Sequence, residues 1–286
     1  MRKLGLIAGG GDLPRTLAQR CVDAGRPFFV VRLKGFADAA MAEFPGADIG
    51  MAELGKCFSA LKKAGCETVC FAGLVARPDF AALKPDMRGM MALPRVISAA
   101  RKGDDGLLRA LLAEFEMEGF VIEGAHEVVD DLTLPVGVLG AVVPEASDKA
   151  DISRAIEVAR AIGRMDIGQG AVVVRGLVLA VEGQEGTDAM LARCADLPKA
   201  LRVGETGEPC GVLAKAPKPI QERRVDLPTI GVATVRAAAR VGLRGIVGEA
   251  GALLVMDRQA VIEAADSLGI FILGIPHAPD DDGAGT

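Results

Sequence analysis

Side chains that could act on a phosphate group gather in the second half of this 286-residue chain. Gln169, Asp188 and Asp226 supply an amide and two carboxylates, and Lys215 and Arg224 supply two cations. Cations neutralise phosphate oxygens, while carboxylates either hold a divalent ion that bridges those oxygens or take a proton from attacking water. The set therefore indicates phosphoryl or pyrophosphoryl chemistry, although a mixed-charge surface open to solvent would have the same composition.

A hairpin followed by a helix is expected to position part of this set. Two β-branched runs at 171–174 and 177–181 flank an Arg-Gly turn, and Gly186-Thr187-Asp188 then opens an apolar-periodic stretch. Free amides at a helix start beside carboxylates suit a phosphate or a metal-phosphate pair. Thr187 or Asp188 could equally be a simple cap for those amides.

A second polar stretch lies between prolines. The segment 219–229 (PIQERRVDLPT) carries Arg223, Arg224 and Asp226. Prolines near both of its ends make a helix unfavourable there. Lys215 precedes it at the end of a short strand expected at 212–214. We therefore expect an irregular loop that carries two arginines and one carboxylate.

Near the amino terminus, Gly10, Gly11 and Asp12 follow a short apolar strand at 3–8. A glycine-rich turn between strand and helix lets a phosphate or ribose approach the backbone closely. The spacing matches neither the dinucleotide-binding fingerprint nor a Walker loop. Arg77 follows a later strand and could reach the same edge of a parallel sheet, where it would grip a phosphate or simply face solvent.

These elements predict an α/β protein with two domains. Strands alternate with helices in the first half, which predicts a Rossmann-like parallel sheet, and the second half predicts a mixed α/β domain. The run LTLPVGVLGAVVPEAS lacks helical periodicity and is expected to be a linker. The expected boundaries are 1–131 for the first domain, 132–147 for the linker, 148–275 for the second domain and 276–286 for a disordered tail.

Composition excludes several classes of function. A net charge of −5 and 3% aromatic residues argue against nucleic-acid binding. With two histidines, a histidine metal cage or a Ser-His-Asp triad is not expected, and the six cysteines match no zinc spacing and are expected to be buried thiols. No long apolar run and no signal peptide are present, which predicts a cytoplasmic protein.

The order of motifs resembles one family. AGGGDLP, AGLVARPDF, DIGQGAVV, LAVEGQEGTDAML, AKAPKPIQERRVDLPTIG and GIVGEAG are similar to the UDP-2,3-diacylglucosamine pyrophosphatases of lipid A biosynthesis, the metal-dependent type unrelated to calcineurin-like phosphoesterases. The resemblance implies Mg²⁺-assisted hydrolysis of UDP-2,3-diacylglucosamine to UMP and 2,3-diacylglucosamine 1-phosphate (lipid X), with water attacking the phosphorus nearer the sugar. It also implies a homodimer with substrate held between two domains. Separately, we expect the domains to close on substrate, because water should reach the phosphorus only in the assembled site. Without a long apolar run, any contact with the cytoplasmic face of the inner membrane is expected to be peripheral.

The resemblance also implies roles for individual residues. The family's critical aspartate falls on Asp226, for metal binding or water activation, and Gln169 and Asp188 join it as catalytic residues. The implied substrate-binding residues are Thr187 at the diphosphate, Lys215 and Arg224 at the developing charge, and Gly10, Gly11 and Asp12 at the nucleotide or sugar. Arg77 joins the substrate-binding candidates through its place at the sheet edge and not through the resemblance.

Two rival functions stay open. A nucleotide-sugar sensor would bind the same ligand without turnover. A sugar-nucleotide transferase would share the phosphate site but pass the group to an alcohol.

Overall fold

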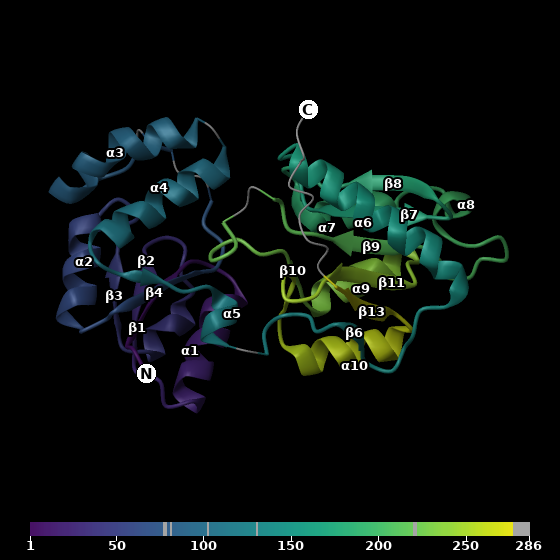
Figure 1. Ribbon diagram of the computed structural model, residues 1–286, viewed down its shortest axis with the longest axis horizontal. Helices are drawn as coiled ribbons and strands as arrows, with labels where there is room; N and C mark the ends of the chain where they lie inside the picture. Colours follow the sequence, from purple (N-terminus) through teal and green to yellow (C-terminus); the bar gives the residue numbers. More distant parts are fainter. Residues whose placement is uncertain (77–78, 81, 102, 130, 220–221, 277–286) are drawn as a thin grey trace. The chain divides into compact units, whose positions relative to one another are not determined.

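The computed structural model describes residues 1–76, 79–80, 82–101, 103–129, 131–219 and 222–276, and the chain divides into two compact units (Figure 1). Unit 1 is Met1–Asp130 together with Glu222–Asp226. Unit 2 is Asp131–Gln221 together with Leu227–Thr286. The short segment 222–226 is therefore separated in sequence from the rest of the unit to which it belongs.

Unit 1 is built on the parallel sheet that the sequence predicts. Its strands are β1 (Leu4–Ala8), β2 (Phe28–Leu33), β3 (Gly46–Ile49), β4 (Thr68–Ala72) and β5 (Val121–Ile122), in the order β3-β2-β1-β4-β5. All neighbouring strands are parallel. This is the strand order of a Rossmann-like sheet, so the predicted fold class is confirmed for this unit.

Helices cover this sheet. They are α1 (Asp12–Asp23), α2 (Leu54–Lys63), α3 (Met87–Ala100), α4 (Asp104–Met117) and α5 (Ala125–Val128), with a 3-10 turn, η1, at Ala39–Glu43. Helix α3 begins at Met87 because the Asp86 carboxylate accepts a hydrogen bond from the Gly89 amide (2.8 Å) and caps the helix. Pro94 thus lies inside the helix.

Unit 2 contains a six-stranded mixed sheet. Its strands are β6 (Gly137–Leu139), β7 (Gly170–Val174), β8 (Leu177–Val181), β9 (Val212–Lys215), β11 (Gly245–Glu249) and β13 (Phe271–Ile275), in the order β6-β13-β11-β9-β7-β8. The central three, β9, β11 and β13, are parallel, and the outer strands are antiparallel to their neighbours. The β7–β8 hairpin is the one predicted from the sequence.

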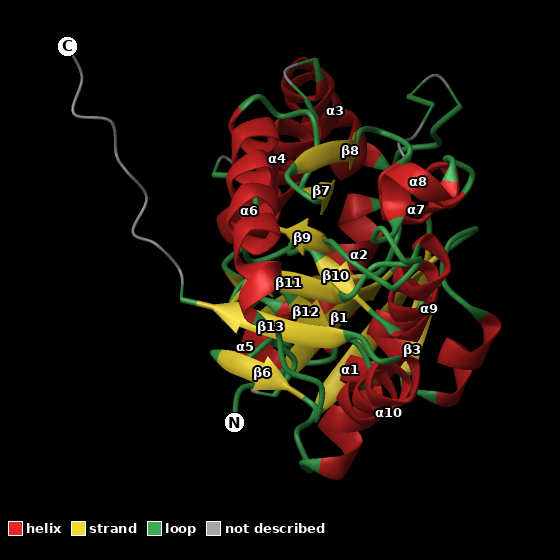
Figure 2. Ribbon diagram, turned by 90° about the vertical axis from the view of Figure 1, so that its right-hand side faces the viewer, coloured by secondary structure: helices red, strands yellow, loops and turns green. Residues whose placement is uncertain are grey.

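Helices lie on both faces of the unit 2 sheet (Figure 2). They are α6 (Lys149–Arg164), α7 (Gly186–Ala195), α8 (Lys199–Arg202), α9 (Val232–Val241) and α10 (Arg258–Leu268); the remaining elements are a 3-10 turn, η2 (Ala146–Asp148), and a two-stranded sheet of β10 (Thr229–Ile230) and β12 (Leu254–Val255). Alternation along β7 explains the layers: Ala171 and Val173 pack with α6, whereas Val172 and Val174 join the core beneath α7, α9 and α10. Every residue of β7 is therefore buried.

The segment predicted as a linker is an integral part of unit 2. Leu134 is fully buried and its amide donates to the Leu253 carbonyl (2.8 Å), and β6 pairs with β13. Proline and glycine in 132–147 mark an edge strand and its turns here, instead of a free connection. The predicted tail, 276–286, lies almost wholly outside the described residues.

Within the described ranges, no helix is both long and apolar enough to span a bilayer.

We predict that Gly73→Ala destabilises unit 1 more than Gly119→Ala. Both glycines have positive φ angles (94° and 92°), but an added Cβ at Gly73 would lie 2.5 Å from the Gly10 carbonyl oxygen, whereas Gly119 has open space. We expect a loss of about 1 kcal/mol for Gly119→Ala and about 3 kcal/mol for Gly73→Ala, measured by urea unfolding. Equal losses of stability would show that the close approach of the Gly73 and Gly10 backbones does not affect the free energy of unfolding.

Candidate functional site

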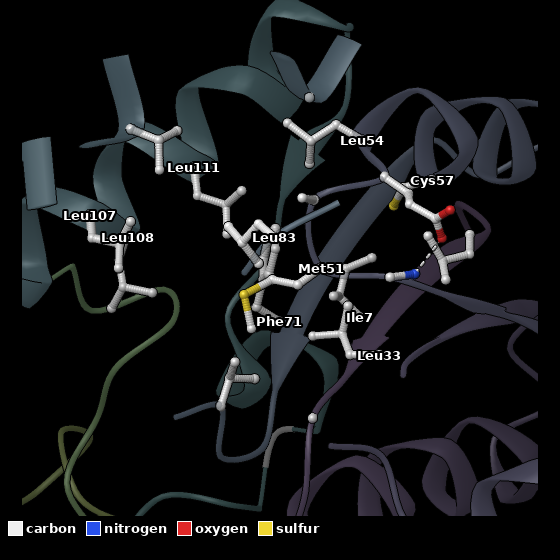
Figure 3. A pocket seen from close by; sticks show the side chains of 18 of the residues that line it. Ile7, Leu33, Met51, Leu54, Cys57, Phe71, Leu83, Leu107, Leu108 and Leu111 are labelled. Atoms are coloured by element: carbon white, nitrogen blue, oxygen red, sulfur yellow. Dashed lines mark hydrogen bonds between the residues drawn. The ribbon is translucent and has the colours of Figure 1, made fainter. Parts of the chain in front are cut away.

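Unit 1 contains an apolar cavity of about 390 Å³ between its sheet and the α3–α4 helix pair. Figure 3 shows Leu107, Leu108 and Leu111 of α4 on one side of it and Ile7 and Leu33 of the sheet on the other. Its lining is almost wholly apolar, and among the described residues the charged side chains that reach it are Glu53 and Asp226. A cavity of this size and lining fits the apolar part of a ligand.

The two carboxylates of the cavity differ in their partners. Glu53 accepts hydrogen bonds from the Lys56 ammonium and the Gly50 amide, and these two donors lower the pKa of Glu53 to about 2. The carboxylate of Asp226 has no hydrogen-bond or ion-pair partner among the described residues. Asp226 is thus the carboxylate that is available to a ligand at this cavity.

An arginine clamp holds the segment that carries Asp226. The Arg224 guanidinium donates to both carboxylate oxygens of Glu222 (2.9 and 3.0 Å) and to Glu116 of α4 (2.8 Å). The Glu222 amide donates to Asp105 (2.9 Å), and the Asp226 amide donates to the Glu222 carbonyl (3.1 Å). These contacts fasten 222–226 to α4 without any helix or strand in the segment.

The clamp changes the expected role of Arg224. Its pKa is raised by hydrogen bonds first to Glu222 and then to Glu116, and the pKa of Glu222 is lowered chiefly by Arg224. In this arrangement the guanidinium is engaged by carboxylates, so its observed contacts anchor a loop. Its expected contact with phosphate stays a prediction.

The glycine turn of unit 1 lies beside the loop after β4. Gly10 and Leu74 exchange backbone hydrogen bonds (2.8 and 2.9 Å), and the Gly11 amide donates to Asp38 (3.2 Å). Asp12 is exposed in the first turn of α1. The amides expected to meet a nucleotide already have protein partners here, and the expected ligand role of the three residues is untested. Arg77 lies outside the described residues.

Unit 2 gathers buried charge at one end of its sheet. Lys215 ends β9 with 3% of its surface exposed, and its ammonium donates to the Thr187 hydroxyl (2.7 Å) and to the Thr229 carbonyl (3.1 Å). Thr187 in turn donates to Glu182 (3.0 Å), which follows β8 and is also buried. Because β8 and β9 both finish at this end, a threonine links a buried carboxylate to a buried ammonium.

Two buried acceptors in this region, Oε2 of Glu182 and Oε1 of Gln169, make no hydrogen bond with the described residues. Glu182 packs closely on Gly168 and Gly170, where any added Cβ would collide with it. Orphaned buried oxygens beside a buried cation are expected where a ligand completes the site.

The side chains of Thr187 and Asp188 have different surroundings in the structure. The helix begins at Gly186, so both lie in its first turn and neither caps it, contrary to one reading of the sequence. The Thr187 hydroxyl is used by Lys215 and Glu182, whereas Asp188 is exposed. Glu182 was not among the expected site residues; its signal was a carboxylate at a strand end opposite two small residues.

The described part of the chain contains no three His, Cys, Asp or Glu side chains grouped so that the protein alone could hold a metal ion. Mg²⁺ usually takes one or two carboxylates and completes its shell with water and phosphate oxygens, so a lone available carboxylate such as Asp226 fits it. Five of the six cysteines are buried, as expected, and burial raises the pKa of Cys57 to about 12.

Comparisons with known proteins cover the whole fold. Family models described as the LpxI N-terminal domain and the LpxI C-terminal domain match residues 3–132 and 135–273. The UDP-2,3-diacylglucosamine pyrophosphatase LpxI of Caulobacter vibrioides is 66% identical over 275 residues, which are 96% of this chain and 98% of that protein. A solved structure, CobK precorrin-6A reductase, aligns with 99% of this chain and 91% of its own at 15% identity, but its TM-score of 0.32 supports no argument.

We predict that the clamp loosens in acid. Since the pKa of Glu222 is lowered from 4.5 in the folded chain, its stabilisation is complete above pH 4.5 and is lost as the pH falls through the lower folded value. Protection of the Val225 and Asp226 amides from hydrogen exchange should therefore fall below pH 4.5. In Glu222→Gln it should be weak at every pH, whereas Glu43→Gln, which breaks an exposed pair with Arg15, should behave as wild type. Equal protection in Glu222→Gln and wild type would contradict the clamp.

Proposed function

The chain belongs to the LpxI family, and from this premise we propose that it hydrolyses UDP-2,3-diacylglucosamine to UMP and lipid X. The name of the Caulobacter relative states the activity, and the two family models match both domains of this chain. The observation in the structure that best supports the proposal is the available carboxylate of Asp226 at the edge of an apolar cavity. That pairing suits a substrate with an acyl end and a diphosphate end.

We assign the acyl part of the substrate to the cavity of unit 1. Each methylene removed from water stabilises binding by about 0.8 kcal/mol, so an aliphatic lining gives affinity for acyl chains without specific hydrogen bonds. Glu53 would not compete for the reaction because Gly50 and Lys56 already occupy its carboxylate. Asp226 would then orient, or take a proton from, the water that attacks the phosphorus nearer the sugar.

We assign phosphate charge to the buried end of the unit 2 sheet. Lys215 is held in place by Thr187 and Thr229, so its charge needs no reorientation when a phosphoryl oxygen becomes more negative. Low exposure also strengthens its electrostatic interactions relative to water. Gln169 would hydrogen-bond the diphosphate, and Asp188 at the start of α7 stays a predicted catalytic residue.

Mg²⁺ is proposed as the cofactor, with Asp226 as its protein ligand. When bound, the ion would neutralise phosphate oxygens and favour departure of UMP. The carboxylate of Asp226 accepts no hydrogen bond from described residues, so no protein contact would have to break. A homodimer and peripheral contact with the cytoplasmic face of the inner membrane are also proposed, and sedimentation and fractionation would test them.

We predict that Asp226→Asn loses at least about 100-fold in kcat because removal of a positioned catalytic group has an effect of this order. Hydrolysis is measured with purified protein and detergent-solubilised substrate in ¹⁸O-labelled water, with Mg²⁺ or with chelator. The label should appear in lipid X and not in UMP, and chelator should abolish turnover. Asp23→Asn, an exposed carboxylate on α1, is the control and should leave kcat unchanged.

Three results would revise this proposal separately. Tight binding without hydrolysis by the wild type would indicate the nucleotide-sugar sensor. Label in UMP would place the attack on the other phosphorus, and full activity of Asp226→Asn would move catalysis to Gln169 and Asp188.

We predict that filling the cavity impairs use of the acylated substrate. Val96→Trp places a bulky side chain in the cavity, whereas Val22→Trp makes the same change on the exposed face of α1. We expect kcat/KM for the diacylated substrate to fall about tenfold or more in Val96→Trp alone, with an analogue that lacks acyl chains unaffected. An equal loss for both substrates would mean that the cavity does not receive the chains.

A further inference from the structure

Helix α3 exposes an apolar surface that folding does not use. Met87, Met90 and Met91 leave 73%, 50% and 67% of their surface exposed, and we call these three residues the methionine face. In the loop after β4, Leu74 and Val75 are also exposed (81% and 41%) and line the mouth of the cavity. Exposed apolar residues that gather on one element mark an interaction surface more often than single exposed residues do.

The opposite face of α3 is apolar as well. Gly89, Ala92, Leu93 and Val96 face the cavity, so the helix is apolar around most of its circumference. A helix of that kind is normally enclosed by protein. Yet α3 lies at the outer edge of unit 1, with α4 between it and much of the sheet (Figure 1). Packing inside unit 1 therefore accounts for one face only.

Cations outnumber carboxylates along the segment that carries the methionine face. Residues 83–105 include Lys84, Arg88, Arg95, Arg101 and Lys102 against Asp86, Asp104 and Asp105. Arg88 and Arg95 bind Glu114 of α4 (2.8 and 2.7 Å), which holds α3 in this orientation. Lys84 and Arg101 are exposed, one before the helix and one directly after it. Apolar residues flanked by cations are the pattern of a helix that lies in the interface of an anionic bilayer.

We propose that α3 docks unit 1 on an anionic lipid bilayer, with the methionine face among the acyl chains and the flanking cations at the headgroups. This inference rests on the proposed function, because under that function both substrate and product are lipids. It adds the surface by which the enzyme would bind the membrane that contains them. A second copy of the chain suits this surface less well. In a two-fold dimer the patch would face itself and bring like charges together.

Flotation with lipid vesicles tests the proposal. The wild-type protein should float with vesicles of phosphatidylcholine and phosphatidylglycerol and bind much less to phosphatidylcholine alone. Met87→Asp with Met91→Asp should weaken binding about tenfold or more, given the apolar area lost. Val22→Asp with Met165→Asp adds the same two charges at residues of similar exposure, 51% and 69%, and should bind as wild type does. Lys84→Glu with Arg101→Glu should remove the preference for phosphatidylglycerol.

Parallel measurements keep the outcomes distinct. Circular dichroism and turnover of detergent-solubilised substrate establish that each variant is folded and that the proposed hydrolysis is intact. If the wild type turns over substrate but does not float, or if the methionine variant floats as wild type does, docking by α3 is refuted while the hydrolase assignment stands. A change of oligomeric state in the methionine variant, with vesicle binding unaltered, would assign the surface to a second copy and overturn the proposal.

Discussion

The candidate site of unit 1 depends on the clamp formed by Arg224. Strands β9 and β10 belong to unit 2, yet the loop between them supplies residues 222–226 to unit 1. A partly exposed ion pair alone contributes little, about 0–1 kcal/mol. Here a bidentate contact to Glu222 is joined by Glu116 and by the Asp105 carboxylate, so several weak interactions fix one short loop. The position of Asp226 at the cavity follows from them.

The buried charges at the end of the unit 2 sheet need a different explanation. Burying Lys215, Glu182 and Glu249 requires desolvation that ion pairs in a protein interior seldom repay in full. Their concentration where β8, β9 and β11 end is therefore poorly explained by stability alone. Carboxyl ends of parallel strands are the usual place for ligands in open α/β sheets, and this region contains the Glu182 and Gln169 oxygens that accept no hydrogen bond from the described residues.

Local sequence patterns predicted the features that depend on neighbouring residues. The β7–β8 hairpin and the alternation of strands and helices in unit 1 could both be predicted from residue periodicity. The motifs also brought attention to Lys215 and Thr187, whose side chains are in contact. Distant contacts could not be read in this way: Glu116 lies 108 residues from Arg224 in sequence, so nothing local distinguishes a loop clamp from a phosphate-binding arginine. The burial of Leu134 likewise depends on Leu253, far along the chain.

The two faces of α3 connect recognition of a lipid with access to it. An acyl chain that leaves a bilayer through water loses about 0.8 kcal/mol for each methylene exposed. If the wall of the receiving cavity is itself the surface that meets the bilayer, most of that exposure is avoided. In unit 1 the wall and the methionine face are opposite sides of one helix, and Arg88 and Arg95 fasten that helix to α4 through Glu114. Docking would thus bring the mouth of the cavity, at Leu74 and Val75, near the membrane without unfolding any element.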